Sequence, residues 1–176
     1  RYTRVREIAA EMLSYQTELP FGKVQTLFCN ETGYQTPKVD TRAAVFDTEG
    51  RLLLVRENNG TWALPGGWCD VDQSPADNTV KETLEEAGLR VRAERLIAVQ
   101  DRNRHNPPPY PYGVVKFFFL CTPLGGEFAA NSETTERAYF SQEALPAPLA
   151  EEKVTREQLL LCFAAHADPD WVTQFD

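Results

Sequence analysis

The chain has 176 residues, of which 42% are hydrophobic. That is enough for one compact domain with a modest appendage and too little for two full domains. Its 18 Lys and Arg residues stand against 26 Asp and Glu residues, so the formal net charge is −8. This acidic balance argues against a general binder of nucleic acid or of anionic membranes. Bound divalent cations would still allow an acidic site to accept an anionic substrate.

The apolar segments and the cysteines both favour a cytoplasmic protein. The longest apolar run, residues 114–121, is broken by Lys116 and is too short to span a bilayer, and no secretory signal is visible. Four cysteines lie far apart and form no C-x-x-C pair, so they indicate neither a zinc site nor a disulfide framework: Cys29, Cys69, Cys121 and Cys162. We therefore expect reduced, buried thiols and no membrane partner.

The chain is predicted to divide into an N-terminal helical extension, residues 1–36, and a main domain, residues 37–176. Apolar residues recur at helical spacing over residues 2–16. A second apolar segment, residues 21–28, is expected to form a short helix before a linker at Glu31–Lys38. Because the sequence opens directly into the first helical pattern, we expect the N-terminus of the natural protein to be missing from it. A helical pair this small cannot bury its own apolar stripe, so we expect it to pack on the main domain or to form a homodimer.

The main domain shows strand patterns on both sides of one well-marked helix. A polar, proline-rich loop is expected over residues 101–113, and a second helix over Val154–Ala165. Apolar and β-branched residues bounded by turn signals predict strands at residues 39–47, 51–57, 62–64, 91–100, 114–121 and 138–140.

The helix predicted over Ser74–Ala87 has signals at both ends. Ser74 suits the N-cap, Pro75 suits the first helical position, and Gly88 suits the C-terminal cap. The helical period predicts that its buried stripe consists of Ala76, Val80, Leu84 and Ala87.

The same helix carries Glu82, Glu85 and Glu86, which spacings of three and four residues place on one face. Three like charges repel one another there, and a divalent cation would remove that repulsion. Mg²⁺ and Mn²⁺ prefer carboxylate oxygens as ligands, and the backbone of Gly67 is expected to approach the same ion. Without the glycine turn, an ordinary solvated helix face would be the preferred interpretation; with it, a metal site is favoured.

The spacing of these residues resembles the Nudix box, G-x5-E-x7-R-E-U-x-E-E-x-G-U, where U is a bulky apolar residue. The resemblance covers about Val39 to Phe140 and implies an α+β fold, an α/β/α sandwich with a mixed sheet, preceded here by the small helical segment. It also implies metal-dependent hydrolysis of a pyrophosphate bond, with Mg²⁺ or Mn²⁺ as cofactor. The positions that match in type and spacing are Gly67, Glu82, Glu85, Glu86, Gly88 and Leu89.

Three positions depart from the family pattern. Gln73 replaces the first glutamate and so keeps hydrogen-bonding capacity without charge. Lys81 replaces the arginine and lacks its bidentate fork, and Thr83 replaces an apolar residue. These changes put the role of the first glutamate in doubt and leave the central glutamates intact.

More of the chain resembles a subgroup of bacterial Nudix hydrolases that have an N-terminal helical extension and include CDP-choline pyrophosphatases. This resemblance implies hydrolysis of CDP-choline to CMP and phosphocholine. Related members act on ADP-ribose, so ADP-ribose or another nucleoside diphosphate sugar is the alternative substrate. The stretches that match are residues 36–40, 66–71, 74–75, 101–105 and 116–121, together with the N-terminal helices.

The loop after residue 100 offers candidate substrate contacts. Arg102, Arg104 and His105 suit phosphate or ribose, and an ordinary solvated loop remains the alternative. The tyrosines of this loop, with Trp68, could stack on a base or enclose a quaternary ammonium group, although plain packing is the alternative for each ring. Trp62 is expected in the core.

The proposed catalytic residues are Glu85, Glu86 and Glu133, with Glu133 as an acidic residue from a later segment that approaches the metals. The expected substrate is a small nucleoside diphosphate conjugate. A catalytically inactive nucleotide-binding regulator is the rival from another class, and the intact glutamates argue against it. RNA end-trimming is a third possibility that the acidic composition disfavours as the main function.

Overall fold

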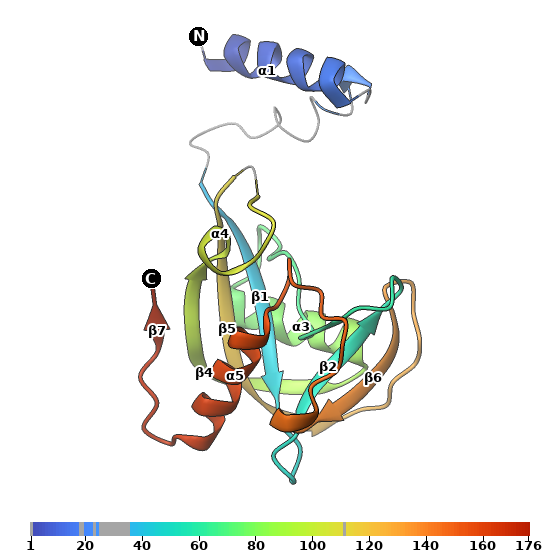
Figure 1. Cartoon of the computed structure of the whole chain (residues 1–176), viewed down its shortest axis with the longest axis vertical. Helices are drawn as coiled ribbons and strands as arrows, with labels where there is room; N and C mark the ends of the chain where they lie inside the picture. Colours follow the sequence, from blue (N-terminus) through green and yellow to red (C-terminus); the bar gives the residue numbers. More distant parts are fainter. Residues whose placement is uncertain (1, 18–19, 23, 25–35, 111) are drawn as a thin grey trace. The chain divides into compact units, whose positions relative to one another are not determined.

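The computed structural model describes residues 2–17, 20–22, 24, 36–110 and 112–176 (Figure 1). The chain separates into two compact units, Arg1–Thr36 and Pro37–Asp176. In the described part of the chain, no helix combines the length and apolarity that a membrane crossing requires.

The N-terminal unit contains helix α1, Tyr2–Thr17, which confirms the helix predicted over residues 2–16. Ala10 is buried, whereas Val5, Met12 and Tyr15 are more than half exposed. The second predicted helix and the linker lie largely outside the described residues. Dimerisation through this unit and the exact domain boundary therefore stay predictions.

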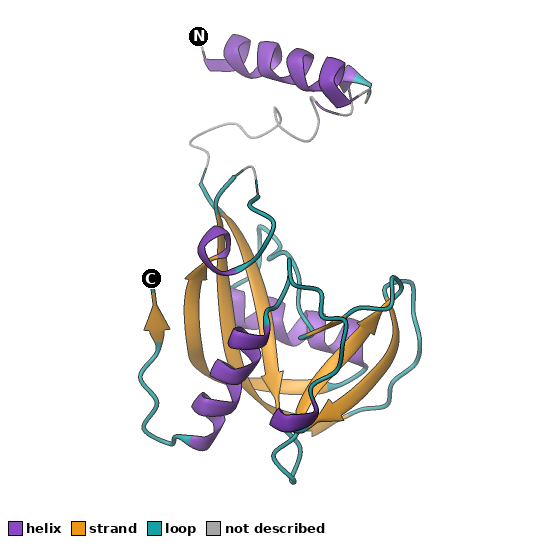
Figure 2. Ribbon diagram, in the orientation of Figure 1, coloured by secondary structure: helices purple, strands orange, loops and turns teal. Residues whose placement is uncertain are grey.

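The main unit is built on two sheets (Figures 1 and 2). The first has the strand order β1-β5-β4-β7, in which β7 is Gln174–Phe175. Strand β1 (Lys38–Val45) is parallel to β5 (Val114–Gly125), and β4 (Arg90–Asp101) is antiparallel to β5. The second has the order β3-β2-β6, with antiparallel pairs. Its strands are β2 (Leu52–Glu57), β3 (Trp62–Ala63) and β6 (Thr134–Phe140). The expected α+β architecture with a mixed sheet is confirmed.

Helices α3 (Pro75–Ala87) and α5 (Arg156–Ala167) cover the first sheet from opposite sides. In Figure 1, α3 lies behind this sheet and α5 lies in front of it. Successive strand residues point to opposite faces, and this alternation divides the core into two clusters. Leu52 and Leu54 of β2 pack with Leu159 of α5, whereas Leu53 and Val55 pack with Ala87 at the end of α3. A sheet buried on both faces explains why these strands read as continuous apolar runs rather than as alternating ones.

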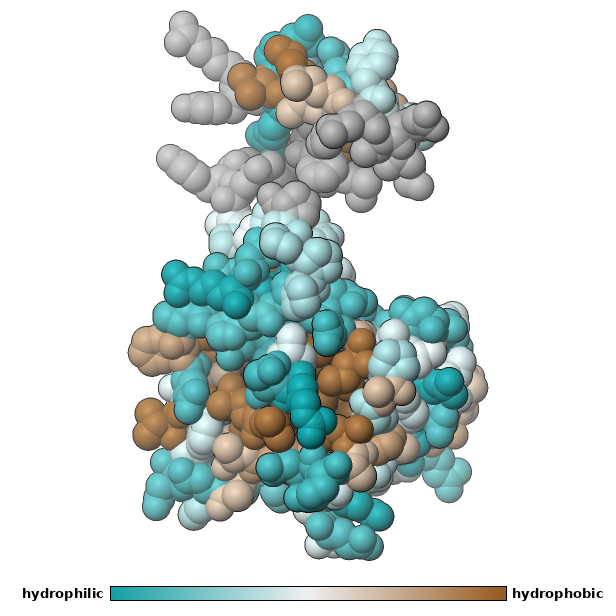
Figure 3. All heavy atoms as spheres, in the orientation of Figure 1, coloured by the Kyte–Doolittle hydropathy of each residue, from teal (hydrophilic) through white to brown (hydrophobic). Residues whose placement is uncertain are grey.

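Three sequence predictions are corrected within the main unit. The loop at residues 101–113 contains a short helix, α4 (Arg102–His105), and β6 begins at Thr134 rather than at residue 138. A C-terminal strand, β7 (Gln174–Phe175), was not expected and pairs with β4. In Figure 3, which has the orientation of Figure 1, the surface of this unit mixes hydrophilic and apolar patches. The side chain of Phe175 in β7 is 79% exposed.

The buried face of α3 follows the prediction in part, because Ala87 is fully buried and Val80 packs against the core. Leu84 is 48% exposed, while polar residues occupy much of the buried side: Asn78, Thr79 and Thr83. The hydroxyl groups of Thr79 and Thr83 donate to the carbonyls one turn earlier, so these polar groups are satisfied without water. The buried face of α3 therefore combines part of the predicted apolar stripe with polar side chains that are held by specific hydrogen bonds.

Candidate functional site

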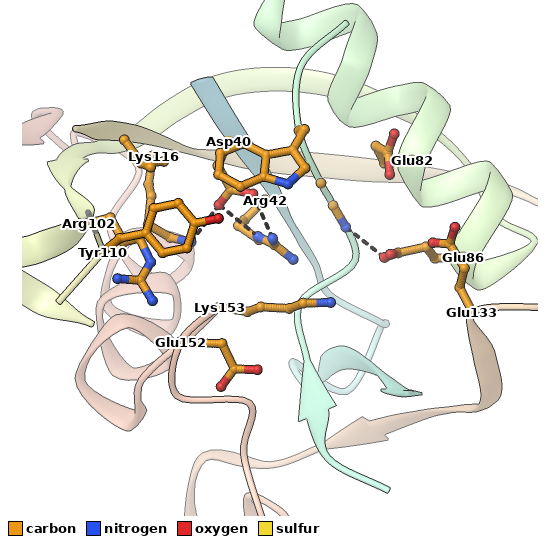
Figure 4. Close-up of a pocket in the computed structure, with 14 residues that line it drawn as sticks. Asp40, Arg42, Glu82, Glu86, Arg102, Tyr110, Lys116, Glu133, Glu152 and Lys153 are labelled. Carbon is orange, nitrogen blue, oxygen red and sulfur yellow. Dashed lines mark hydrogen bonds and ion pairs between the residues drawn. The ribbon is translucent and has the colours of Figure 1, made fainter. Parts of the chain in front are cut away.

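A cleft of ≈ 380 Å³ lies beside the N-terminal half of β1 and the facing side of α3 (Figure 4). Its lining comes from distant parts of the main unit and is rich in charged side chains. The lining residues are Asp40, Arg42, Gly66, Gly67, Trp68, Glu82, Glu86, Arg102, Tyr110, Val114, Lys116, Glu133, Glu152 and Lys153.

The turn at Gly66 and Gly67 brings the backbone against the carboxylates of α3. Gly66 has φ 143, and a Cβ atom there would lie 1.9 Å from the carbonyl oxygen of Thr41, so only glycine fits. The backbone N–H of Gly66 donates to Oε2 of Glu86 at 2.8 Å. A Cβ on Gly67 would come within 2.7 Å of Oε2 of Glu82. The two glycines thus allow close approach to both glutamates.

Helix α3 is fixed at both ends as the sequence predicts. The Ser74 hydroxyl accepts from the Asp77 N–H at 3.1 Å, and Gly88 adopts the left-handed conformation with φ 61. Asn78 then ties the helix to the cleft strand, because its side-chain amide donates to the Thr41 hydroxyl at 2.9 Å. These bonds set the rotation of the helix and hence the direction of Glu82 and Glu86.

Glu86 is 8% exposed and faces the cleft. Burial raises the pKa of Glu86 to about 7, although the charge of Arg42 and the hydrogen bond from Gly66 act in the opposite direction. Burial likewise raises the pKa of Glu82, against the influence of Lys81. Two carboxylates held in this way gain from a nearby cation, so the donor set suits a hard divalent metal ion.

The four predicted acidic residues are placed differently. Glu82, Glu86 and Glu133 line the cleft, whereas Glu85 does not line it and its side chain is 60% exposed. Among the described residues, no three His, Cys, Asp or Glu side chains already stand in metal-binding positions. The Gly67 carbonyl, a predicted metal ligand, accepts from the Thr41 N–H at 2.9 Å.

Of the three departures from the motif pattern, Lys81 has a local explanation in the structure. Lys81 pairs with Asp70 at 2.7 Å and with Glu82 at 3.1 Å, and these bonds raise its pKa. Asp70 is therefore one partner of Lys81, and sequence reasoning missed it. Gln73 makes no such pair, and its side-chain oxygen is buried without a hydrogen-bond partner in the described part of the chain.

A buried charge network lies across the cleft from the glutamates. Arg42 donates to both carboxylate oxygens of Asp40, at 2.6 and 3.1 Å, and Lys116 donates to Oδ2 at 2.5 Å. Burial alone would raise the pKa of Asp40, but the two cations outweigh it and lower that pKa. Burial and the charge of Arg42 together lower the pKa of Lys116 to about 8. Sequence reasoning missed this network.

The predicted substrate-binding residues separate into two groups. Arg102 and Trp68 line the cleft, and the Arg102 guanidinium lies 5.0 Å from the ring centroid of Tyr110. Arg104 and His105 are not among its lining residues, and His105 instead contacts Asp176 at 2.6 Å. Sequence spacing alone does not separate Arg102 from Arg104 and His105. Helix α4 is a single turn, so its successive side chains point in different directions.

Comparison with known proteins agrees with this site. Residues 36–161 match the NUDIX domain, most of the main unit. A Bacillus subtilis (strain 168) protein, YjhB, provisionally named an ADP-ribose pyrophosphatase, is 40% identical over the whole chain and 84% of its own length. The solved structure of an ADP-ribose pyrophosphatase from Streptococcus suis 89-1591 is 55% identical, with a TM-score of 0.74 over 80% of this chain and 100% of that one. A solved UDP-X diphosphatase is 34% identical, with a TM-score of 0.72 over 100% of this chain and 85% of that one.

The chain therefore belongs to the Nudix family. Within that family it is a pyrophosphohydrolase, an enzyme that cleaves the diphosphate linkage of a nucleotide conjugate.

Proposed function

We propose that the protein hydrolyses the diphosphate bond of a nucleoside diphosphate joined to a sugar, with ADP-ribose as the first candidate. The products would be a nucleoside monophosphate and a sugar phosphate. The observation that carries this proposal is the cleft itself, in which the carboxylates of α3 face a basic and aromatic side across a space of ≈ 380 Å³.

Glu82 and Glu86 are the proposed metal-binding carboxylates, with Glu133 beside them and Glu85 and the Gly67 carbonyl as further ligands. Bound Mg²⁺ or Mn²⁺ would neutralise the phosphate charge and activate a water molecule. The chain's own contribution is to aim the carboxylates. The Gly66 N–H fixes one oxygen of Glu86, and Lys81 holds Glu82 from the other side at 3.1 Å. Glu86 or Glu133 would accept the proton of the attacking water.

The preference for a sugar rests on the names of the relatives and on a second hollow that adjoins the cleft. This hollow shares Glu86, Glu133 and Lys153 with the cleft, and its other lining residues are Glu57, Asn58 and Asn59. Carboxylates, amides and an ammonium group suit the hydroxyls of a sugar, whereas a trimethylammonium group would gain nothing from the amides or from the lysine.

CDP-choline is the second candidate, because two aromatic rings, those of Trp68 and Tyr110, line the cleft and Tyr112 packs against Tyr110. The ring centroids of Trp68 and Tyr110 are 6.3 Å apart, and those of Tyr110 and Tyr112 are 4.7 Å apart. Such faces can hold a quaternary ammonium group. The relatives reported above give CDP-choline no support, so it stands second.

The test is a product assay on the full chain with ADP-ribose, UDP-glucose and CDP-choline, each with Mg²⁺, with Mn²⁺ and with a chelator. We expect metal-dependent release of AMP from ADP-ribose, with the highest kcat/KM of the three. A higher kcat/KM for CDP-choline would reverse the order of the candidates. Nucleotide binding without turnover of any conjugate would favour the inactive regulator instead.

A further inference from the structure

One carboxylate serves two buried cations on the side of the cleft away from α3. Asp40 is the acceptor for both Arg42 and Lys116, and the exposed fractions of the three side chains are 6%, 5% and 2%. The pairing is built into the sheet, because Asp40 and Lys116 are direct partners in the parallel register of β1 and β5. The group of three therefore holds one positive charge that Asp40 does not balance.

Burying such an excess charge is unfavourable unless another group compensates it. The acidic side of the cleft acts on Arg42, since the charges of Glu86 and Glu57 raise its pKa. Lys116 has Asp40 as its ion-pair partner, but burial and the charge of Arg42 outweigh that partner and lower the pKa of Lys116. The excess positive charge is thus poorly compensated at Lys116, which lines the cleft.

Arg102 adds a third cation on this side (Figure 4). Its guanidinium donates to the carbonyl of Pro108 at 2.7 Å and to the side-chain oxygen of Asn103 at 3.3 Å, both of which are neutral. In the described part of the chain, no carboxylate lies within ion-pair distance of Arg102. By contrast Lys153, the remaining cation of the lining, pairs with Glu57 at 2.5 Å.

In Figure 4, Lys116, Arg102 and Tyr110 lie on one side of the cleft, and Glu82, Glu86 and Glu133 lie on the other. The acidic side repels anions unless cations are bound there. The basic side attracts anions whether or not a metal is present. An anion subsite and a cation subsite therefore stand opposite each other in one space.

We propose that Lys116, together with Arg42 and Arg102, forms a metal-independent subsite for a phosphate group of the nucleotide. That the anion is a phosphate rests on the proposed function. In the substrate, this subsite takes the phosphate that the glutamate side does not hold. After hydrolysis, it retains the nucleoside monophosphate, whose base lies against Trp68 and Tyr110.

Calorimetric titration of the metal-free full chain in excess chelator tests this subsite without any turnover. The probes are AMP, inorganic phosphate and adenosine. We expect AMP to bind more tightly than either phosphate or adenosine, and its affinity to fall with rising salt. Absence of AMP binding to the metal-free wild type would overturn the proposal. Equal affinity for AMP and adenosine would also overturn it, because the base alone would then account for binding.

Lys116→Met keeps the length of the side chain and leaves Arg42 and Asp40 as a balanced pair, so the variant is expected to fold. We expect its AMP affinity to fall by about tenfold or more, the scale of a lost charge-assisted hydrogen bond, and Lys116→Arg to restore much of it. The matched control is Arg92→Gln, which removes one exposed cation outside the cleft. An unchanged AMP affinity in Lys116→Met, or an equal loss in the control, would refute the subsite.

The subsite and the proposed function can fail separately in these experiments. A protein that binds AMP through Lys116 without hydrolysing any conjugate would keep the subsite and lose the enzymatic proposal. A protein that hydrolyses ADP-ribose without metal-free AMP binding would do the reverse.

Discussion

The backbone N–H of Gly66 donates a 2.8 Å hydrogen bond to Oε2 of Glu86, which joins the glycine turn directly to helix α3. One carboxylate oxygen is thereby fixed by the protein, and the carboxylate still lines the cleft, where we propose that it binds a metal ion. The side chain of Glu85 is 60% exposed and, unlike that of Glu86, does not line the cleft.

Glu86→Gln should lower kcat for the best conjugate by about a hundredfold or more, because the neutral amide keeps the shape and loses the charge that holds the cation. Glu85→Gln should have a smaller effect, and both variants should melt near the wild-type temperature. Steady-state kinetics with Mg²⁺ and with Mn²⁺ provide the comparison. Near wild-type rates in Glu86→Gln would remove Glu86 from the metal site.

Gly67→Ala should lower the apparent affinity for Mg²⁺ by about tenfold or more, on the scale seen when a ligand's surroundings are altered. The added methyl group would lie 2.7 Å from Oε2 of Glu82, and the flexible carboxylate would have to turn away. Gly66→Ala should instead destabilise the fold, because its methyl group would meet backbone at 1.9 Å. Metal titrations of activity, together with thermal melts, distinguish the two effects. An unchanged metal dependence in Gly67→Ala would contradict the first expectation.

The stability of the protein should depend on pH through Lys116. Its pKa is lowered from 10.5 to about 8 in the folded state, so the unfolded chain holds more protons between these values. Stability due to this residue therefore rises as pH rises through that window, and it is lost as pH falls back through the folded pKa. The difference in unfolding free energy between wild type and Lys116→Met, measured with urea, should move in favour of wild type across the window. A difference that is flat with pH would show that Lys116 does not titrate there.

Trp68→Ala should raise KM for a nucleotide conjugate by about tenfold and change kcat little, because a ring that stacks on a base binds substrate and transition state alike. Trp68 is 50% exposed beside Tyr110, so its loss should leave the fold intact. Val71→Ala, a fully exposed neighbour, is the control. If kcat falls while KM stays constant, Trp68 acts in the chemical step and not in binding.

Asn78→Ala should destabilise the main unit by about 1–3 kcal/mol, because the partners of a buried amide would lose their hydrogen bonds. These partners are the Thr41 hydroxyl at 2.9 Å and the Asp70 N–H at 3.3 Å. Leu84→Ala on the same helix should change stability by no more than about 0.5 kcal/mol, since Leu84 is 48% exposed. Urea unfolding measures the loss of stability in both variants. A larger loss in Leu84→Ala than in Asn78→Ala would support the apolar stripe that the sequence predicts.

The features that sequence reasoning predicts correctly are local ones. Ser74, Pro75 and Gly88 mark the ends of α3, and each acts through atoms within five residues along the chain. The side of α3 that faces the cleft follows in part from helical spacing, which places Glu82 and Glu86 together.

The features that it missed depend on contacts between distant segments. Asp40 and Lys116 are 76 residues apart in sequence, and neither carries a local signal of its partner. His105 was expected to contact substrate, but its partner is Asp176, 71 residues away. The direction of a side chain on a one-turn helix such as α4 is set by such contacts and not by spacing.

The parallel pairing of β1 with β5 also bears on how the protein is made. During synthesis, β1 leaves the ribosome long before its neighbour, because Val114, the partner of Lys38, follows it by 76 residues. Until then β1 has an open edge towards the missing strand, and the basic side of the cleft does not exist. Closing so large a loop is slow compared with forming α3, so we expect the helix with its glutamates to form before the cations that face it across the cleft.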